Sequence, residues 1–377
     1  MPDDFATTLT AWRHHLHTHP ELSRQERETA AFVCARLDEL GIPYEAGIGG
    51  HGVVASLKRG NSNRSVGLRA DMDALPIPEA TGKPYASTRP GVMHACGHDG
   101  HTTSLLGAAM LLKDDPDWSG QIHLVFQPAE EGYKGAHAMV EDGLFQRFPM
   151  ERIFGYHNWP GLEAGTVMVH PESVMAGAVN FVVTMKGKAG HAGMPHLCID
   201  PVQGIAQLIV AVNSIVARNL PPIQSGVIST CMLKAGEARN QVPERASMEG
   251  TIRAYTTESM ELLKRRLTET AKGVATALGL EADVWLGEEL SPTGNVPEQA
   301  ELMAQAAAEA GLRVRRDMEP TMGAEDFGRF LVDVPGAYAW VGNGPSSGLH
   351  SPTYDYNDEI LPLAAKLLAS TAKAALR

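Results

Sequence analysis

The first 160 residues alternate between short β-branched apolar runs and longer stretches with helical periodicity. Residues from about Asp4 to Leu40 predict helix, which Pro20 interrupts and Gly41 ends. The apolar run that follows His98 predicts a buried helix. Strands are predicted at residues 52–57, 66–70, 121–127 and 152–160. This alternation is typical of a mostly parallel α/β domain.

A different pattern begins near Ala176. A half-exposed strand, a long helix, two strands and a second long helix are predicted at residues 179–187, 200–219, 226–234, 246–255 and 258–278. This order predicts a compact α+β unit of the ferredoxin-like kind, which we place at residues 176–290. The last part returns to the first pattern, with helices at 298–310 and 360–376 and a strand at 337–341. We therefore expect residues 1–175 and 291–377 to form one domain, with residues 176–290 inserted into it.

The composition narrows the class of protein. At 377 residues the chain exceeds the usual size of a single core, which agrees with two domains. Its net charge of −12 argues against nucleic acid or an anionic membrane surface as a partner. Four cysteines do not make a disulfide framework, and we see neither a secretory signal nor an apolar stretch that approaches a membrane span. We expect a reduced, cytoplasmic protein.

The densest group of metal-binding side chains lies in residues 93–103. Cys96 and His98 are two residues apart, which is too close for one face of a helix but suits a tight turn around Gly97. A thiol and an imidazole from one turn suit a transition metal such as zinc. We interpret this turn as half of a two-metal hydrolytic centre, with His94 and His101 as structural neighbours.

Other candidates follow the predicted strands. Asp71 and Asp73 come at the end of one strand, Glu130 and Glu131 follow another, and His157 ends a third. Ligands of α/β sheets gather at the carboxyl ends of strands. Adjacent acids in an extended segment point in different directions, so one can bind metal while the other handles protons. Turn capping by the aspartates and a solvated glutamate pair are the simpler alternatives.

The histidines at positions 14, 15, 17 and 19 also invite a metal interpretation. No cysteine or carboxylate is spaced to complete such a site, and Pro20 breaks the helix beside it. We expect these histidines to be structural.

Six motifs together resemble the co-catalytic metallopeptidase family of aminoacylases, carboxypeptidase G and succinyl-diaminopimelate desuccinylase. The likeness is greatest to its hippurate hydrolase, N-acyl-amino-acid amidohydrolase and auxin-conjugate hydrolase branch. The motifs are residues 69–77, 93–102, 126–132, 190–192, 323–327 and 349–352. They occur in the family's order over essentially the whole chain, which is more specific than any single motif.

The resemblance implies a catalytic domain that holds two divalent metal ions, zinc or manganese, with cobalt or nickel as alternatives. The implied ligands are Cys96, His98, Glu131, His157 and His350, with Cys96 bridging the metals. The inserted domain is implied to form a homodimer.

The resemblance also assigns roles around the metals. Glu130 matches the general base, and Asp73 matches an acid that orients a ligand histidine. His191 matches a histidine of the inserted domain that completes the active site, commonly that of the partner subunit. Asn240 and Arg253 match positions that contact substrate.

These residues favour an enzyme that hydrolyses the amide bond of an N-acyl or N-aroyl amino acid, a small-molecule substrate. Water activated by the metals would attack the carbonyl, with Glu130 as general base. A carboxypeptidase or dipeptidase using the same metals is the nearest alternative. A catalytically inactive binding relative is a third, disfavoured because no ligand position departs from the family pattern.

Overall fold

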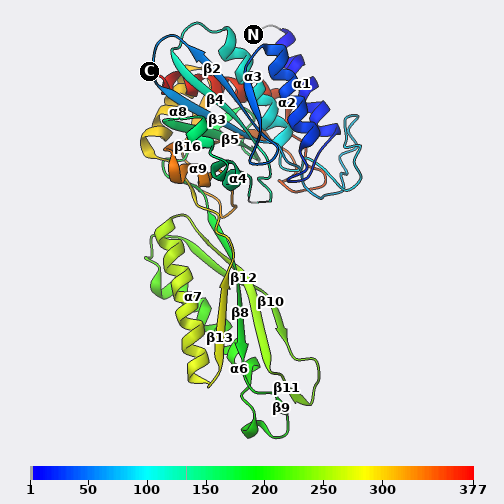
Figure 1. Cartoon of the computed structure of the whole chain (residues 1–377), viewed down its shortest axis with the longest axis vertical. Coiled ribbons are helices and arrows are strands. Elements are labelled where there is room, and N and C mark those ends of the chain that lie inside the picture. The colour runs from blue at the N-terminus through cyan, green and yellow to red at the C-terminus, as the bar shows by residue number, and fades with distance from the viewer. Residues whose placement is uncertain (1–2, 133) are drawn as a thin grey trace. The chain divides into compact units, whose positions relative to one another are not determined.

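The computed structural model describes residues 3–132 and 134–377, and the chain divides into two compact units (Figure 1). Unit 1 comprises Met1–Val174, Gly294–Pro320 and Asp326–Arg377, and unit 2 comprises Met175–Thr293 and Thr321–Glu325. The boundaries fall within a few residues of those expected near 176 and 290. The short segment 321–325 is a part of unit 2 that the sequence pattern did not assign to it.

Unit 1 is built around an eight-stranded mixed sheet in the order β1-β2-β4-β3-β5-β16-β6-β15. The central strands β4, β3, β5 and β16 run parallel to one another, whereas β1–β2, β2–β4 and β16–β6 pair antiparallel. The predicted α/β class is confirmed. The strands are β1 (Tyr44–Ile48), β2 (Gly52–Arg59), β3 (Ser65–Asp71), β4 (Gly120–Gln127), β5 (Arg152–Pro160), β6 (Thr166–Met168), β15 (Arg313–Arg315) and β16 (Gly336–Gly344).

Helices cover this sheet. Five of them share one hydrophobic core with the sheet, namely α1 (Asp3–Thr18), α2 (Arg27–Leu40), α3 (His98–Asp114), α8 (Pro297–Glu309) and α10 (Leu361–Ala375). The strand residues between those of this core, such as Val54 of β2 and Val125 of β4, are also buried but do not belong to it. Near them lie α4 (Gly135–Glu141), α5 (Leu144–Arg147) and α9 (Gly328–Asp333), and α4 contacts both β4 and α9. Gly41 ends α2 in the left-handed conformation (φ +66°), as its position predicted.

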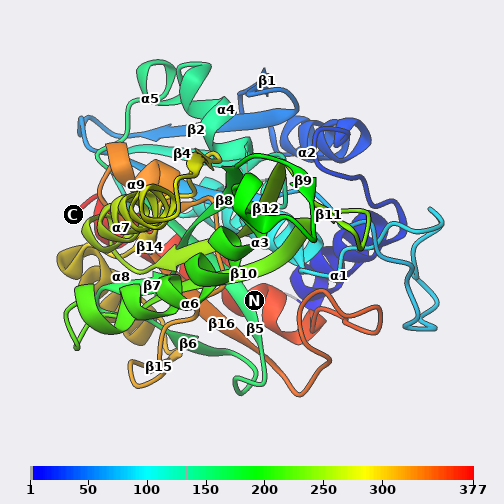
Figure 2. The ribbon, with the colours of Figure 1, turned by 90° about the horizontal axis from the view of Figure 1, so that it is seen from below.

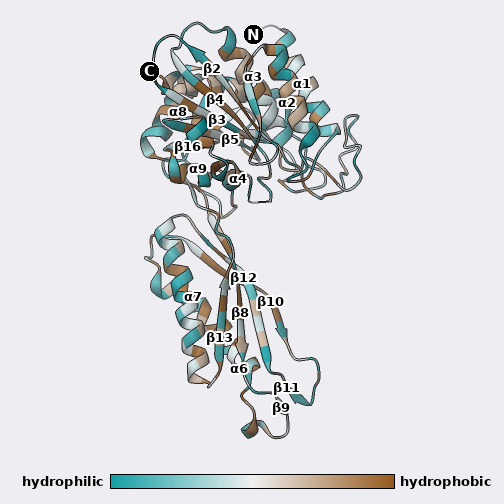
Figure 3. Ribbon diagram, viewed as in Figure 1, coloured by the Kyte–Doolittle hydropathy of each residue, from teal (hydrophilic) through white to brown (hydrophobic). Residues whose placement is uncertain are grey.

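Unit 2 has the predicted ferredoxin-like arrangement. Four antiparallel strands in the order β10-β12-β8-β13 form its sheet, and α6 and α7 pack side by side against it (Figure 2). The elements are β8 (Gly177–Lys186), α6 (Pro201–Asn219), β10 (Gly226–Ala235), β12 (Arg245–Ala254), α7 (Thr257–Ala277) and β13 (Glu281–Leu286). Val179, Phe181 and Val183 of β8 are buried at every second position, and α7 alternates hydrophilic and hydrophobic positions (Figure 3). The sequence pattern did not predict β13, whose six residues carry two acids.

Short elements complete the chain. They are β7 (Ser173–Met175), β9 (Gly190–His191), β11 (Gln241–Val242), β14 (Thr293–Gly294) and the 3-10 helices at Pro195–Leu197 and Asp358–Ile360. β9 pairs with β11, and β7 pairs with β14.

Helix α6 is long and apolar enough to cross a membrane when only its length and composition are considered. The sequence-based expectation that no apolar stretch approaches the length of a membrane span was therefore wrong. Leu208, Val212 and Ile215 of this helix belong to the core of unit 2, so its apolar character has a packing explanation.

Candidate metal centre

Three neighbouring parallel strands bring acids and a histidine to one edge of the unit 1 sheet. β3 ends at Asp71, two residues before Asp73. β4 ends shortly before Glu130 and Glu131, and β5 carries His157 near its end. Because β4, β3 and β5 are adjacent and parallel, their carboxyl ends meet at the same edge.

The turn with Cys96 and His98 reaches this edge at the start of α3. Gly97 has φ +93°, a conformation that favours glycine. A Cβ at this position would collide with the side-chain oxygen of Asn158 and lie 2.6 Å from the hydroxyl of Tyr354. Glycine is therefore favoured at position 97 for two reasons: the backbone has a positive φ, and there is no room for a Cβ.

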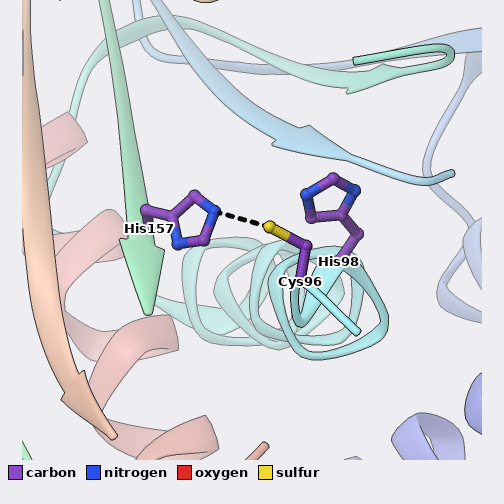
Figure 4. A group of neighbouring side chains, drawn as sticks. All are labelled: Cys96, His98 and His157. Carbon is purple, nitrogen blue, oxygen red and sulfur yellow. Dashed lines mark hydrogen bonds between the residues drawn. The ribbon is translucent and has the colours of Figure 1, made fainter. Parts of the chain in front are cut away.

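The turn places Cys96 against His157 (Figure 4). The Cys96 Sγ lies 3.3 Å from His157 Nε2. The ligand atoms of Cys96, His98 and His157 all lie within 4.8 Å of one another. The thiol therefore lies in a compact group of one sulfur and two imidazole nitrogens.

A second group shares the same thiol. Ligand atoms of Cys96, Glu131 and His350 also lie within 4.8 Å of one another, and His350 Nε2 is 3.3 Å from Glu131 Oε1. His350 adopts φ +63°, which is unusual for a residue with a side chain. The five residues expected as ligands thus form two groups of three that have only Cys96 in common.

These groups contain buried polar atoms that suit a cation. His98 Nε2 and Glu131 Oε1 are buried and make no hydrogen bond to any described residue. Burial and the charges of Glu131 and Glu130 raise the pKa of the Cys96 thiol well above its usual value. Without a cation the thiolate is disfavoured, whereas a divalent ion would stabilise it and pair the orphan atoms. Sulfur, nitrogen and oxygen donors together suit zinc and similar ions.

Asp73 connects a ligand histidine to the glutamate pair. Its backbone oxygen lies 2.9 Å from His98 Nδ1, which leaves Nε2 as the ligand atom. Its carboxylate accepts hydrogen bonds from the amides of Glu130 and Glu131, both at 3.0 Å, and from the hydroxyl of Ser23 at 2.6 Å. Asp73 is 1% exposed. The hydrogen bond to His98 comes from the backbone of Asp73, and the carboxylate Oδ1 lies 3.4 Å from the same nitrogen, so the orienting role of the acid stays a prediction. The two amide contacts were not foreseen.

Asp71 and His101 belong to a buried network beside the ligand groups. His101 lies between Asp71 Oδ1 (2.6 Å from Nδ1) and Asn158 Oδ1 (2.7 Å from Nε2). Arg69 donates to Asp71 Oδ2 at 2.6 Å. Although burial opposes it, Arg69 holds the pKa of Asp71 well below its usual value. Both Asp71 oxygens are therefore engaged by protein groups, and both ring nitrogens of His101 have partners.

The N-terminal histidines lie in α1 or directly after it. His17 is buried between Asp99, 2.8 Å from its Nδ1, and Glu79, 3.3 Å from its Nε2. Although burial alone lowers it, Asp99 raises the pKa of His17 to about 9, so this ring pairs as a cation. His14 contacts Asp358 at 2.8 Å. These ion pairs agree with the structural role that we expected.

Three predicted site residues lie in unit 2. His191 is exposed in β9, and the amide of Gly193 donates to its Nδ1 at 3.0 Å. Asn240 is also exposed and accepts the amide of Ala192 through its backbone oxygen at 3.0 Å. Arg253 is half-buried in β12 and donates to the backbone oxygen of Met322 at 2.8 Å. Their roles in catalysis and binding stay predictions.

Comparison with known proteins supplies the family. Residues 67–374 match the model for peptidase family M20/M25/M40. The chain belongs to this family. This membership confirms the resemblance found in the sequence. It also shows that the protein is a hydrolase that acts on amide bonds.

Several M20 relatives match over nearly the whole chain. The hippurate hydrolase of Campylobacter jejuni is 39% identical over 362 residues, which cover 96% of this chain and 94% of that protein. The N-acetyl-L-cysteine deacetylase of Bacillus subtilis is 39% identical over 366 residues, 97% of this chain and 87% of that protein. The structure of Bacillus subtilis YXEP, a dinuclear metal-binding peptidase of the M20 family, matches with a TM-score of 0.90 and 32% identity, covering 100% and 99%. These matches support divalent metal ions as cofactors of this M20 enzyme.

Gly97→Ala tests the tight turn. The left-handed backbone costs a residue with a Cβ about 1–2 kcal/mol, and the collision with Asn158 adds to this cost. We expect a lower Tm and weaker metal binding, because Cys96 and His98 flank the shifted residue. Thermal unfolding and metal analysis measure both effects. Gly82→Ala, also at positive φ but with nothing within 4 Å of the new Cβ, is the control for backbone strain alone. Equal metal binding by the two variants would contradict the account.

Asp73→Asn tests the hydrogen bonds that the Asp73 carboxylate accepts from the glutamate pair, because asparagine keeps the backbone oxygen that contacts His98. An amide cannot accept hydrogen bonds through both side-chain atoms, so one of the Glu130 and Glu131 amides loses its partner. We expect kcat/KM to fall roughly 10–100-fold, as for other residues that orient metal ligands. Steady-state kinetics at saturating metal measure this, and an unchanged kcat/KM would remove Asp73 from the site.

Proposed function

We propose that this M20 enzyme hydrolyses the amide bond of N-acyl or N-aroyl amino acids at a two-metal centre. The observation that carries the proposal is the pair of ligand groups that share Cys96, with Glu130 beside them. The named activities of the hippurate hydrolase and the N-acetyl-L-cysteine deacetylase support this substrate class. The products would be a carboxylic acid and a free amino acid.

The metal ligands in this proposal are divided between two ions. His98 and His157 would hold one ion, Glu131 and His350 would hold the other, and Cys96 would contribute to both sites. A thiolate and imidazoles favour zinc by affinity, and manganese is the alternative, with cobalt or nickel as substitutes. When bound, the ions supply Lewis acidity, which polarises the substrate carbonyl and lowers the pKa of water.

Glu130 is the general base in this proposal. It is 5% exposed, and one carboxylate oxygen lies within 4.8 Å of ligand atoms of His98 and Glu131. From this position Glu130 takes the proton of the attacking water and returns it to the departing nitrogen. Its neighbour Glu131 lies in the group with Cys96 and His350 as well as beside His98 and Glu130, and in this proposal it binds metal while Glu130 handles the proton.

His191 is the proposed donor to the oxyanion. Because its Nδ1 accepts the amide of Gly193, the neutral ring carries its proton on Nε2, which makes that atom a hydrogen-bond donor. Such a donor stabilises the tetrahedral intermediate by about 2.7–4 kcal/mol. Asn240 and Arg253 are the proposed contacts to the substrate. We propose a homodimer formed through unit 2, in which His191 serves the partner's metal centre.

Subunit mixing tests the shared site. His191→Ala and Glu130→Gln are each expected to be inactive as homodimers. A mixed dimer contains one centre with both native residues and one with neither. Random exchange of equal amounts makes about half of the dimers mixed, so mixing should restore about a quarter of the wild-type activity. Activity after mixing, with subunit exchange verified by tagged chains, measures this. Absence of recovery despite exchange would contradict a site completed across the dimer.

The substrate class is tested with a panel of N-acetyl, N-benzoyl and indole-acetyl amino acids and several dipeptides, assayed with zinc, manganese, cobalt or nickel. Hydrolysis of acyl amino acids ahead of dipeptides is the expected result. The description of YXEP as a peptidase favours a dipeptidase or carboxypeptidase as the second candidate, and preferred cleavage of dipeptides would select it.

We also propose a reducing, cytoplasmic environment. All four cysteines are free thiols, and Cys231 is exposed. The proposed function itself needs a reduced Cys96, because oxidation of the thiol would remove the shared ligand.

A further inference from the structure

Two buried carboxylates hold the general-base turn, residues 129–131. Three consecutive amides of this turn donate to them. The amide of Ala129 donates to Glu26 Oε1 at 2.8 Å, and the amides of Glu130 and Glu131 donate to Asp73 at 3.0 Å. Ala129 adopts φ +51°, and successive amides around a left-handed residue form a concave anion-binding site. In this M20 enzyme the side chains of Glu26 and Asp73 occupy the place of such an anion.

Glu26 lies at the start of α2, in a stretch for which the sequence predicted only helix. It is fully buried, and its Oε1 also accepts the amide of Arg24 at 2.9 Å. No other described residue donates a hydrogen bond to its Oε2. Three residues before it, Ser23 donates to Asp73. One short segment therefore supports both carboxylates that hold the turn.

Ala129 is 3% exposed, and hydrogen bonds hold it at both ends: its amide donates to Glu26, and its carbonyl oxygen accepts the amide of Gly135 at 3.1 Å. An open hollow of about 360 Å³ borders the turn and is lined by Ala129, Gly49 and Gly50 among other residues of unit 1. The turn therefore has room to relax on that side. Because the left-handed conformation is unfavourable for alanine, Ala129 would leave it without its acceptor. Burial and the nearby charge of Asp73 raise the pKa of Glu26 to about 7, and strongly perturbed acids of this kind cluster at functional sites.

We propose that Glu26 is a positioning residue for amide hydrolysis. By accepting the Ala129 amide, Glu26 holds the turn in the conformation that aims the Glu130 carboxylate at the ligand groups. This inference rests on the proposed function, in which Glu130 is the general base. A displacement of a catalytic group by about 1 Å can cost about 10²-fold in rate, so a residue that does not touch the substrate can control kcat.

Three substitutions at Glu26 separate positioning from folding. Glu26→Ala removes the acceptor, Glu26→Asp retracts it by one methylene, and Glu26→Gln keeps an oxygen in place. Glu21→Ala is the matched control, because Glu21 is 5% exposed and accepts both the amide and the hydroxyl of Thr29 at the same helix start. Among the described residues, the hydrogen bonds and the ion pair of its side chain go to Thr29 and Arg89 rather than to the general-base turn.

The test compares kcat and KM of the metal-loaded variants and amide hydrogen exchange of residues 127–132. For Glu26→Ala we expect kcat to fall about 30–100-fold relative to Glu21→Ala, with KM changed less than about threefold. Glu26→Gln should recover kcat to within about threefold of wild type, and Glu26→Asp should not. Exchange of the turn should be faster in Glu26→Ala than in Glu21→Ala.

Equal kcat values or equal exchange for Glu26→Ala and Glu21→Ala would overturn the proposal. If Glu26→Ala does not fold, the comparison of Glu26→Asp with Glu26→Gln decides, and equal kcat and exchange in these two would overturn it. If the wild-type enzyme cleaves no amide of the panel, the proposed function fails. Hydrogen exchange still reports in that case whether Glu26 holds the turn.

Discussion

Glu130→Gln is expected to lower kcat by about 10²–10⁴-fold while both metal ions stay bound. Glutamine fills the same volume and keeps the backbone amide that donates to Asp73. It cannot take a proton from water at neutral pH, so only the proton transfer is removed. Because Glu130 is not one of the proposed ligands, the metal content should not change. Steady-state kinetics together with metal analysis of the purified variant measure the two quantities.

Glu141→Gln provides the matched control for this substitution. It makes the same chemical change at an exposed position at the end of α4. Its kcat and metal content should equal those of the wild type. If Glu130→Gln retained turnover with both metals bound, Glu130 would not be the general base. If it lost metal, the division of labour between Glu130 and Glu131 would be wrong.

Cys96→Ala is expected to lose metal as well as activity. The thiol belongs to both ligand groups, so its removal takes one donor from each ion. The loss in kcat/KM should exceed the roughly 10–100-fold that is typical of residues that only orient a ligand. Because alanine is small and apolar, the buried position tolerates it without a new unpaired polar atom. Metal content and kcat/KM of the purified variant are the measurements.

Cys231→Ala separates this effect from the general loss of a thiol. Cys231 is exposed in β10 of unit 2, outside both ligand groups. Its metal content should be unchanged. A Cys96→Ala protein that kept two metals per chain with wild-type affinity would contradict the shared ligand.

The sequence predicted the long helices and the central strands of unit 1 because their patterns are strong and local. It did not predict the short or peripheral elements β1, β6, β15, α4, α5 and α9. The apolar strands β3, β4 and β5 each end in polar residues, and the rule that ligands gather at the carboxyl ends of strands placed Asp73, Glu130 and His157 together. The Cys96–His98 turn was recognisable from its spacing. The assignment of His350 rested on the resemblance, because it lies far along the chain in a loop without a periodic pattern.

Other parts of the centre could not be predicted, because their partners are distant in sequence. Glu26 and Ala129 are 103 residues apart, and His17 and Asp99 are 82 apart. Nothing near either residue indicates its partner. The histidine cluster shows the same limit, since His17 is buried in ion pairs while His14, three residues earlier, contacts Asp358 at the other end of the chain. Tertiary packing, not local pattern, decides these outcomes.

Metal titration of the chelator-treated enzyme tests the central claim most directly. Zinc or manganese is added in known amounts per chain while release of the free amino acid from N-benzoylglycine and the other panel substrates is followed. The account predicts no hydrolysis without metal and activity that rises until two ions are bound per chain. Hydrolysis by the metal-free protein, or full activity at one ion per chain, would contradict a two-metal centre built around Cys96.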